Sequence, residues 1–465
     1  MELVSSSLMK EFVDSFFLLL LKTQNFIYKR LLEDQIDVPS VALQVAQDLP
    51  SVARDLKLGV LKKMTVRSEI HGQTTSCVTI YLGLALLASI IAQVNGQMVP
   101  LTIIDKAQEK LAICIDGTPG GYHFDPGFGD GANNWIIMLM GGGWCGLNIC
   151  QYRIGKDLGS TTNIPPQNFE GILSSDQSIN PDFYNWNRVF IRYCDGGSFM
   201  GDAQRDDNGH IVELRGLRVF TAVMDELLNV KGMKKTENAI LAGGSAGALA
   251  AILLCDRYRA LIPDAKRVKC LSQSGFFIRA KDLPDANRRE GGFAHIIDFH
   301  NMIDALPKSC TSKMNASLCL FPEYVVGDVQ TPLFLLNPIF DTFQLQHLVR
   351  PNPPELDGWN TTCINNSLDP SHPPCPDLTR CTPSQMQLVK DYGGALLDAI
   401  NEIQDIPSRG LFLSSCYAHD FVPATWSAAS YRLQDKTISQ AFSDWYFDRS
   451  PAKMIDNRID APLKC

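Results

Sequence analysis

Short apolar runs alternate with helical hydrophobic periods along residues 97–465 of this chain. The runs are the length of buried strands, and most are too uniformly apolar to leave one face in water. A helical period covers 217–230, where Leu217, Phe220, Val223 and Leu227 fall on one face. The predicted strands lie at 135–140, 188–193, 239–243, 268–271, 332–336 and 411–414. The alternation predicts an α/β fold with a mostly parallel central sheet and helices on both faces.

Two segments stand apart from this alternation. Residues 352–383 are rich in Pro, Cys and Asn, which is typical of a disulfide-stapled insertion or lid. Residues 78–94 form a long apolar run whose small residues near Gly96 suit signal-peptidase cleavage. We therefore expect residues 64–96 to be a signal peptide that starts at Met64, residues 1–63 to be an extension of the gene model, and residues 97–465 to be one hydrolase-type domain. The alternative is a retained membrane anchor with a cytosolic tail.

Charge and cysteine content narrow the function classes. The net charge of −8, without a sustained Lys/Arg stripe, argues against a nucleic-acid binder. Fourteen cysteines without paired C-x-x-C sets favour disulfides over a metal site, and hence export. Local candidate pairs are Cys145/Cys150, Cys310/Cys319 and Cys375/Cys381. Glycosylation sequons at Asn315, Asn360 and Asn365 agree with a secreted surface.

The segment 239–254 carries a G-x-S-x-G motif between an apolar run and an Ala/Leu-rich helical segment. A strand that turns sharply into a helix at such a motif exposes the serine hydroxyl at the sheet edge. We interpret Ser245 as a nucleophile. The alternative is a Gly/Ser pair that merely caps the strand and helix.

A serine nucleophile needs a base and a carboxylate that orients the base, in the chain order serine, acid, histidine for this arrangement. Of the histidines after Ser245, only His419 directly follows a predicted strand, whereas His295, His300, His347 and His372 lie in helical, packing or insertion segments. Asp341 is the first carboxylate after the predicted strand 332–336, where it could instead cap a helix. We predict that His419 is the base and that Asp341, in the loop after that strand, is the acid.

Attack on an ester produces an oxyanion that needs N–H donors fixed in advance. The triple glycine 141–143 ends a predicted strand and allows close backbone approach, and Ala246 directly follows the nucleophile. We predict donors at Gly143, Trp144 and Ala246. The alternatives for the triple glycine are a tight turn and a phosphate loop, and the second lacks the Lys-Ser/Thr that should follow.

Several longer motifs together resemble the plant pectin acetylesterases, which are related to the animal carboxylesterase Notum. The resemblance spans 99 to nearly the end of the chain and is carried by Tyr122-His123-Phe124-Asp125, Gly141-Gly142-Gly143-Trp144-Cys145, Arg192-Tyr193-Cys194-Asp195-Gly196, Gly243-Gly244-Ser245-Ala246-Gly247 and Asp444-Trp445-Tyr446.

The resemblance implies an α/β-hydrolase-like fold, secretion to the cell wall, and removal of O-acetyl groups from pectin. It assigns the family's serine, aspartate and histidine to Ser245, Asp341 and His419. We expect acetylated pectin as the partner, no metal or organic cofactor, no nucleic acid, no stable membrane association, and a monomer. The rival interpretations are a Notum-like deacylase of lipid esters and a catalytically silent polysaccharide-binding relative.

Overall fold

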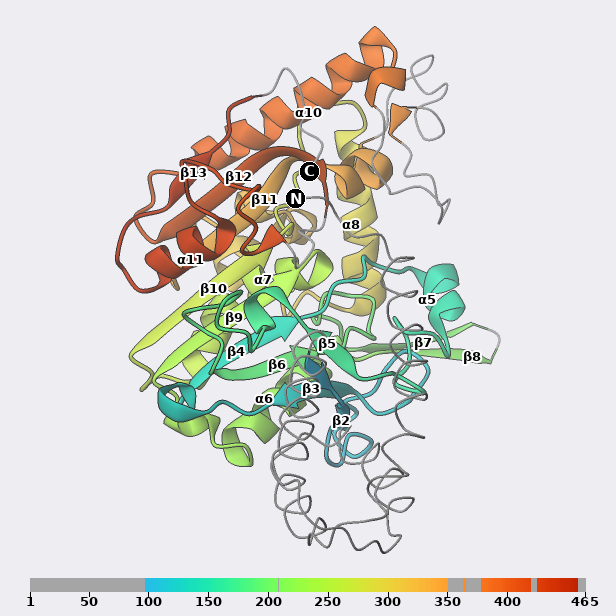
Figure 1. Ribbon diagram of the computed structural model, residues 1–465. Helices are drawn as coiled ribbons and strands as arrows, with labels where there is room; N and C mark the ends of the chain where they lie inside the picture. Colours follow the sequence, from blue (N-terminus) through green and yellow to red (C-terminus); the bar gives the residue numbers. More distant parts are fainter. Residues whose placement is uncertain (1–96, 208, 350–362, 365–377, 420–424, 459–465) are drawn as a thin grey trace, which may run out of the picture. The chain divides into compact units, whose positions relative to one another are not determined.

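The computed structural model describes residues 97–465 except 208, 350–362, 365–377, 420–424 and 459–465 (Figure 1). Its central element is a nine-stranded sheet in the order β13-β12-β11-β10-β9-β4-β6-β3-β2. Neighbouring strands are parallel from β13 to β6, and only the edge pairs β6–β3 and β3–β2 are antiparallel. The sheet is therefore mostly parallel, as predicted. Its strands are β2 (Leu101–Ile103), β3 (Gly121–Asp125), β4 (Asn134–Leu139), β6 (Asn187–Ile191), β9 (Asn238–Gly244), β10 (Arg267–Gln273), β11 (Leu333–Asp341), β12 (Arg409–Ala418) and β13 (Lys453–Ile455).

Smaller elements surround this sheet. Two antiparallel ribbons are formed by β1 (Gln97–Val99) with β5 (Gln167–Phe169) and by β7 (Ala203–Asp207) with β8 (His210–Leu214). The helices are α5 (Leu147–Arg153), α6 (Gly216–Asn229), α7 (Ala246–Leu261), α8 (Ala286–His300), α9 (Lys308–Thr311), α10 (Pro383–Asn401) and α11 (Ile438–Tyr446). Short helical turns are η1 (Gly129–Gly131), η2 (Gly171–Leu173), η3 (Met233–Lys235), η4 (Ala316–Leu320), η5 (Pro322–Tyr324), η6 (Gln344–Leu348) and η8 (Leu378–Arg380).

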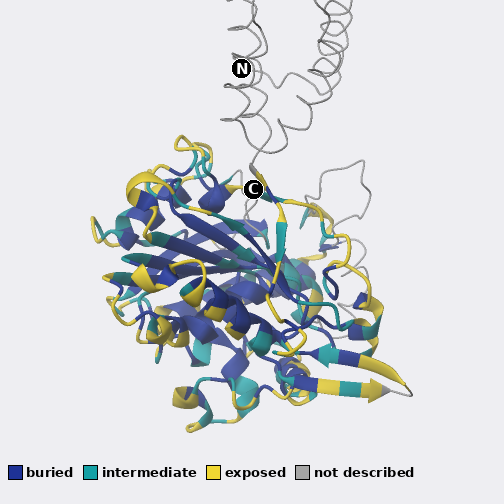
Figure 2. Ribbon diagram, turned by 90° about the horizontal axis from the view of Figure 1, so that it is seen from below, coloured by how far each residue is buried: buried dark blue, intermediate teal, exposed yellow. Residues whose placement is uncertain are grey.

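The two faces of the sheet bury separate hydrophobic clusters. Along β9, Ala239 and Leu241 pack with α6, α7 and α10, whereas Ile240 and Ala242 face the cluster that includes α11. Successive strand side chains point to opposite faces, so a strand covered on both sides is apolar at most positions. Figure 2 shows that most of the central sheet is buried. The uniformly apolar runs of the sequence are explained by this double coverage.

Local sequence signals fix where the late helices begin. Thr382 and Thr437 each accept a hydrogen bond from a backbone N–H three residues later, and Gln385 and Gln440 return the bond to the cap residue's N–H. These reciprocal pairs satisfy donors that the first helical turn leaves without partners. They start α10 and α11 on opposite faces of the sheet.

Two strands extend beyond their predicted ends. The run predicted at 332–336 continues as β11 to Asp341, and the run predicted at 411–414 continues as β12 to Ala418. Asp341 is thus the last residue of a strand, and its prediction as a loop residue was wrong. The extension is possible because β11 and β12 pair side by side up to Asp341 and Ala418, with an irregularity between Pro338 and Phe340.

Five disulfides join described cysteines. The predicted pairs Cys145–Cys150 and Cys310–Cys319 are present, and Cys114–Cys194 and Cys255–Cys270 link segments more distant in sequence. The predicted pair Cys375/Cys381 was wrong, because Cys381 bonds to Cys363. This bond staples the segment 352–383 as expected, although most of that segment lies outside the described residues.

The predictions for the amino-terminal part concern residues that the structure does not describe. Residues 1–63 and the apolar run 78–94 both lie there, as do the sequons at Asn360 and Asn365, whereas Asn315 is exposed. Within the described part of the chain, none of the helices has the length and apolar character needed to cross a bilayer.

Candidate active site

Ser245 lies on a sharp turn between β9 and α7. Its backbone has φ 53° and ψ −122°, a conformation that L-residues adopt rarely and at a cost of roughly 1–3 kcal/mol. The surrounding glycines are required by close packing. A Cβ on Gly243 would lie 2.1 Å from the Gly247 carbonyl oxygen, and a Cβ on Gly247 would lie 2.2 Å from the Leu139 carbonyl oxygen. The G-x-S-x-G pattern is therefore the sequence signature of a strained turn held against β4.

Three side chains that are distant in sequence form one hydrogen-bonded chain. Nε2 of His419 lies 2.7 Å from Oγ of Ser245, and Nδ1 of His419 lies 2.9 Å from Oδ2 of Asp341. Parallel pairing places Asp341 opposite Ala418, so His419 emerges from β12 beside the carboxylate. The structure thus brings together the three residues that chain order predicted.

Asp341 uses both of its carboxylate oxygens. Oδ2 faces the His419 ring, and Oδ1 accepts a hydrogen bond from the backbone N–H of Gln344 at 2.9 Å. The side chain is fully buried. The two roles weighed for Asp341, as a cap at a helical turn and as the partner of the histidine, are therefore both met, one by each oxygen.

Aromatic rings surround the histidine. The Phe343 ring stacks on His419 with centroids 5.0 Å apart, and Phe277 lies 6.2 Å away. Trp144 packs edge-on against Phe277 and Phe343 at 4.9 and 6.1 Å. Phe293 packs on the other side of Trp144 at 5.0 Å, so Trp144, Phe277, Phe293 and Phe343 form an aromatic cluster that borders the His419 ring.

The glycine loop after β4 reaches the serine directly. A Cβ on Gly141 would lie 2.5 Å from the Gly244 carbonyl oxygen and 2.9 Å from Cβ of Ser245, so only glycine allows this approach. Gly143 has φ +62°. Among the described residues, none accepts a hydrogen bond from the backbone N–H of Gly143, Trp144 or Ala246. Within the described part of the chain, the backbone N–H groups of the predicted oxyanion donors are therefore without partners.

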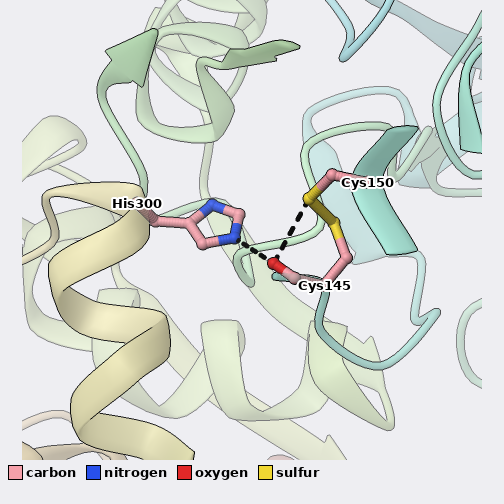
Figure 3. A group of neighbouring side chains, drawn as sticks. All are labelled: Cys145, Cys150 and His300. Carbon is pink, nitrogen blue, oxygen red and sulfur yellow. Dashed lines mark hydrogen bonds between the residues drawn. A yellow bond between two sulfur atoms is a disulfide. The ribbon is translucent and has the colours of Figure 1, made fainter. Parts of the chain in front are cut away.

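The carbonyl groups of this loop accept hydrogen bonds from side chains that the sequence analysis did not identify as functional. Arg153 donates to the Gly142 carbonyl at 2.7 Å, and the Tyr193 hydroxyl donates to the Gly143 carbonyl at 2.6 Å. His300 donates from Nε2 to the Cys145 carbonyl at 2.8 Å, next to the Cys145–Cys150 disulfide (Figure 3). Tyr193 lies in the Arg192-Tyr193-Cys194-Asp195-Gly196 motif, which was the one available signal.

The other four histidines that follow Ser245 in the sequence occupy different surroundings. Burial lowers the pKa of His300 to about 4, so this ring is neutral near pH 7. His295 is exposed and stacks on Phe299. His347 lies near Phe343, and burial together with the nearby His419 lowers its pKa. His372 lies outside the described residues.

Cys145, Cys150 and His300 also cluster closely enough to hold a metal ion by distance alone. Both sulfur atoms are joined in a disulfide, so neither offers the thiolate that a metal requires (Figure 3). The cluster is better explained as an anchor for the end of the glycine loop.

Comparison with known proteins gives a consistent set of relatives. A family model described as Pectinacetylesterase matches residues 92–465. Pectin acetylesterase 11 of Arabidopsis thaliana is 39% identical over 378 residues, which cover 80% of this chain and 93% of the relative. Palmitoleoyl-protein carboxylesterase notum2 of Xenopus laevis is 26% identical over 89% of this chain and 83% of its own length.

Among solved structures, the Wnt deacylase Notum from Drosophila matches with a TM-score of 0.62 at 22% identity. The match covers 78% of this chain and 97% of that structure. It identifies the fold as a Notum-like α/β hydrolase, as predicted.

Proposed function

The chain belongs to the pectinacetylesterase family, and from that membership we propose that it is a serine carboxylesterase that removes acetyl groups from pectin. The observation that carries the serine mechanism is the hydrogen-bonded chain from Ser245 through His419 to Asp341. The predicted silent binding relative would not need these contacts, nor the strain stored at Ser245.

In the first half of the reaction, Oγ of Ser245 attacks the acetyl carbonyl carbon and transfers its proton to Nε2 of His419. Asp341 holds the imidazole by Nδ1 and stabilises the positive charge that develops on it. The carbonyl oxygen becomes an oxyanion, which the N–H groups of Gly143, Trp144 and Ala246 stabilise. The intermediate then collapses, the imidazolium gives its proton to the departing sugar oxygen, and an acetyl-enzyme remains.

In the second half, His419 removes a proton from a water molecule as that water attacks the acetyl-enzyme. The same N–H groups stabilise the second oxyanion. Collapse of this intermediate returns the proton to Oγ of Ser245 and releases acetate. The proton transfers use Ser245, His419 and Asp341, which already lie within hydrogen-bonding distance of one another.

The aromatic cluster supports a short acyl group. Phe277 is fully buried and Phe343 packs against the His419 ring, so both rings occupy volume next to the histidine that bonds the Ser245 hydroxyl. A series of sugar or nitrophenyl esters with acyl chains of increasing length tests this point. Preference for acetate supports an acetylesterase, whereas preference for long chains would favour the Notum-like alternative.

Export to an oxidising compartment explains why the cysteines form disulfides. Disulfides are rare in reducing compartments, and five join described residues here. We propose a monomer secreted to the cell wall after cleavage near Gly96, with residues 97–465 as the mature enzyme. Amino-terminal sequencing of the secreted protein checks the cleavage position.

The deciding experiment measures acetate released from acetylated pectin by the wild type, Ser245→Ala and Ser443→Ala. Ser443 is a matched control, because its hydroxyl is buried in α11 without a hydrogen-bond partner among the described residues. Loss of the nucleophile is expected to lower kcat by about 10⁶-fold, whereas the control stays near wild type. Equal activity of Ser245→Ala and wild type would refute the serine mechanism.

A further inference from the structure

The three free N–H groups of the candidate oxyanion site are not all oriented in the same way. Ala246 opens α7, and the first N–H groups of a helix point outward from its end without partners in the helix. Gly143 and Trp144 belong to a loop, where rotation of the peptide units could turn each N–H away from the serine. Something other than regular secondary structure must therefore fix these two peptide planes.

Arg153 and Tyr193 bind the two peptide units that carry the Gly143 and Trp144 N–H groups. A trans peptide is planar, so its carbonyl and its N–H point in opposite directions. Arg153 binds the Gly142 carbonyl, which belongs to the same peptide unit as the Gly143 N–H. Tyr193 binds the Gly143 carbonyl, which belongs to the same peptide unit as the Trp144 N–H.

We propose that Arg153 and Tyr193 are positioning residues that aim the N–H groups of Gly143 and Trp144 at the oxyanion of the reaction. This inference rests on the proposed function, because it needs an acyl oxygen to stabilise. Neither side chain touches the substrate. Each acts by holding a carbonyl on the far side of the loop, and the two N–H groups then point away from that side.

The Tyr193 side chain is itself held in place. The Tyr193 hydroxyl also accepts a hydrogen bond from the backbone N–H of Ser198 at 3.0 Å, which leaves its own hydrogen free for the Gly143 carbonyl. Burial raises the pKa of Tyr193, so the hydroxyl stays protonated as a donor. The Trp144 indole N–H donates to Oγ of Ser198 at 2.8 Å, which ties the next residue to the same segment.

The far end of the loop is fixed in the same manner. The N–H of Cys145 donates to the Gly196 carbonyl at 3.1 Å, and His300 donates to the Cys145 carbonyl (Figure 3). With Cys145 immobile, the two peptide units between Gly142 and Trp144 have little freedom except rotation about the chain. Arg153 and Tyr193 oppose that rotation.

The experiment compares Tyr193→Phe with Tyr258→Phe. Tyr258 is a matched control, since its hydroxyl is buried and has no hydrogen-bond partner among the described residues. Complete loss of one oxyanion donor lowers kcat by about 10²–10³-fold, so a misaimed donor should lower it by about tenfold. We expect kcat of Tyr193→Phe to fall by about this factor with KM within about twofold of wild type.

Two further measurements separate positioning from general damage. The pH midpoint of kcat/KM should stay at its wild-type value, because Ser245, His419 and Asp341 are unchanged. Arg153→Met should also lower kcat, and Arg153→Lys, which keeps a donor, should recover part of the loss. If Tyr193→Phe does not fold, as judged by thermal unfolding, the two Arg153 variants decide the proposal by themselves.

The proposal would be overturned if folded Tyr193→Phe and Arg153→Met both kept the wild-type kcat. A shifted pH midpoint would also overturn it, because the shift would mean that the triad itself was disturbed. In either case Ser245→Ala would still be inactive, and the proposed function would stand. If Ser245→Ala retained wild-type activity, the serine mechanism and the positioning role would both be refuted.

Discussion

Asp195 and His300, two buried ionisable residues behind the glycine loop, should give the folding stability opposite responses to pH. Burial raises the pKa of Asp195 from 3.8 to about 6, although the N–H groups of Gly197 and Phe199 and the charge of Arg153 partly offset this effect. The folded protein then holds the proton more tightly than the unfolded chain does. The free energy of unfolding should therefore fall by about 3 kcal/mol as pH rises from below 4 to above 6, at 1.36 kcal/mol for each pKa unit.

His300 acts in the other direction. Burial lowers its pKa from 6.5 to about 4, with smaller contributions from the charges of Arg205, Arg153 and His295. The unfolded chain takes up this proton first, so the contribution of His300 is fully present above pH 6.5 and is lost as pH falls toward 4. Its size is also about 3 kcal/mol, and the two groups nearly cancel in the wild type between pH 4 and 6.5.

Replacing either group should reveal the response of the other. Asp195→Asn keeps a side-chain acceptor for Gly197 and Phe199, and its free energy of unfolding should rise between pH 4 and 6.5 by about 3 kcal/mol more than that of wild type. His300→Gln, which keeps a donor for the Cys145 carbonyl, should instead show a decrease of the same size relative to wild type over this range.

Urea unfolding followed by tryptophan fluorescence at the two pH values measures these differences, provided that the slopes against urea agree between variants. If the stability of Asp195→Asn changed with pH in parallel with that of wild type, Asp195 would titrate normally in the folded protein. The same measurement on His300→Gln tests the contribution of His300, so the opposing contributions of the two residues are checked separately.

Two other predictions concern the catalytic geometry. Asp341→Asn should lower kcat by about 10⁴-fold with little change in KM, because an amide cannot hold the reactive tautomer of His419. Acetate release measures kcat, and a loss of less than tenfold would contradict this prediction. Gly141→Ala forces a Cβ to within 2.5 Å of the Gly244 carbonyl oxygen and should lower kcat by about 10²-fold. The control is Gly291→Ala, which lies on the exposed side of α8 where a Cβ meets open space. This variant should leave kcat unchanged and raise the free energy of unfolding by about 0.5–1 kcal/mol. Equal kcat values for the two glycine variants would refute the packing argument.

The hydrophobic pattern located the central strands correctly but did not predict where two of them end. The apolar runs located the strands because both faces of the sheet are covered. The strand 332–336 was expected to stop before Asn337, yet β11 continues through Pro338 to Asp341. Only pairing with β12, which is distant in sequence, makes those later residues part of a strand.

The cysteines show the same limit. The pair Cys145–Cys150 could be found by spacing, because the two residues are five apart and joined by a short helical segment. Cys381 was assigned to its near neighbour Cys375 but bonds to Cys363. Short separation favours a bond only where the chain between the cysteines brings them together, and that depends on how the segment packs.

The sequence by itself determined the serine turn, since the glycines of G-x-S-x-G are required wherever a strand bends into a helix so tightly, and it determined the order of Ser245, Asp341 and His419. Only the tertiary structure decided the orientation of the glycine loop. From three separate parts of the chain, Arg153, Tyr193 and His300 bind the carbonyls of Gly142, Gly143 and Cys145, and His300 lies 155 residues from the carbonyl that it binds. Hydrophobic periodicity and motif spacing report on neighbours along the chain, whereas the direction of a loop N–H is set by whatever side chain the fold brings to the carbonyl opposite it.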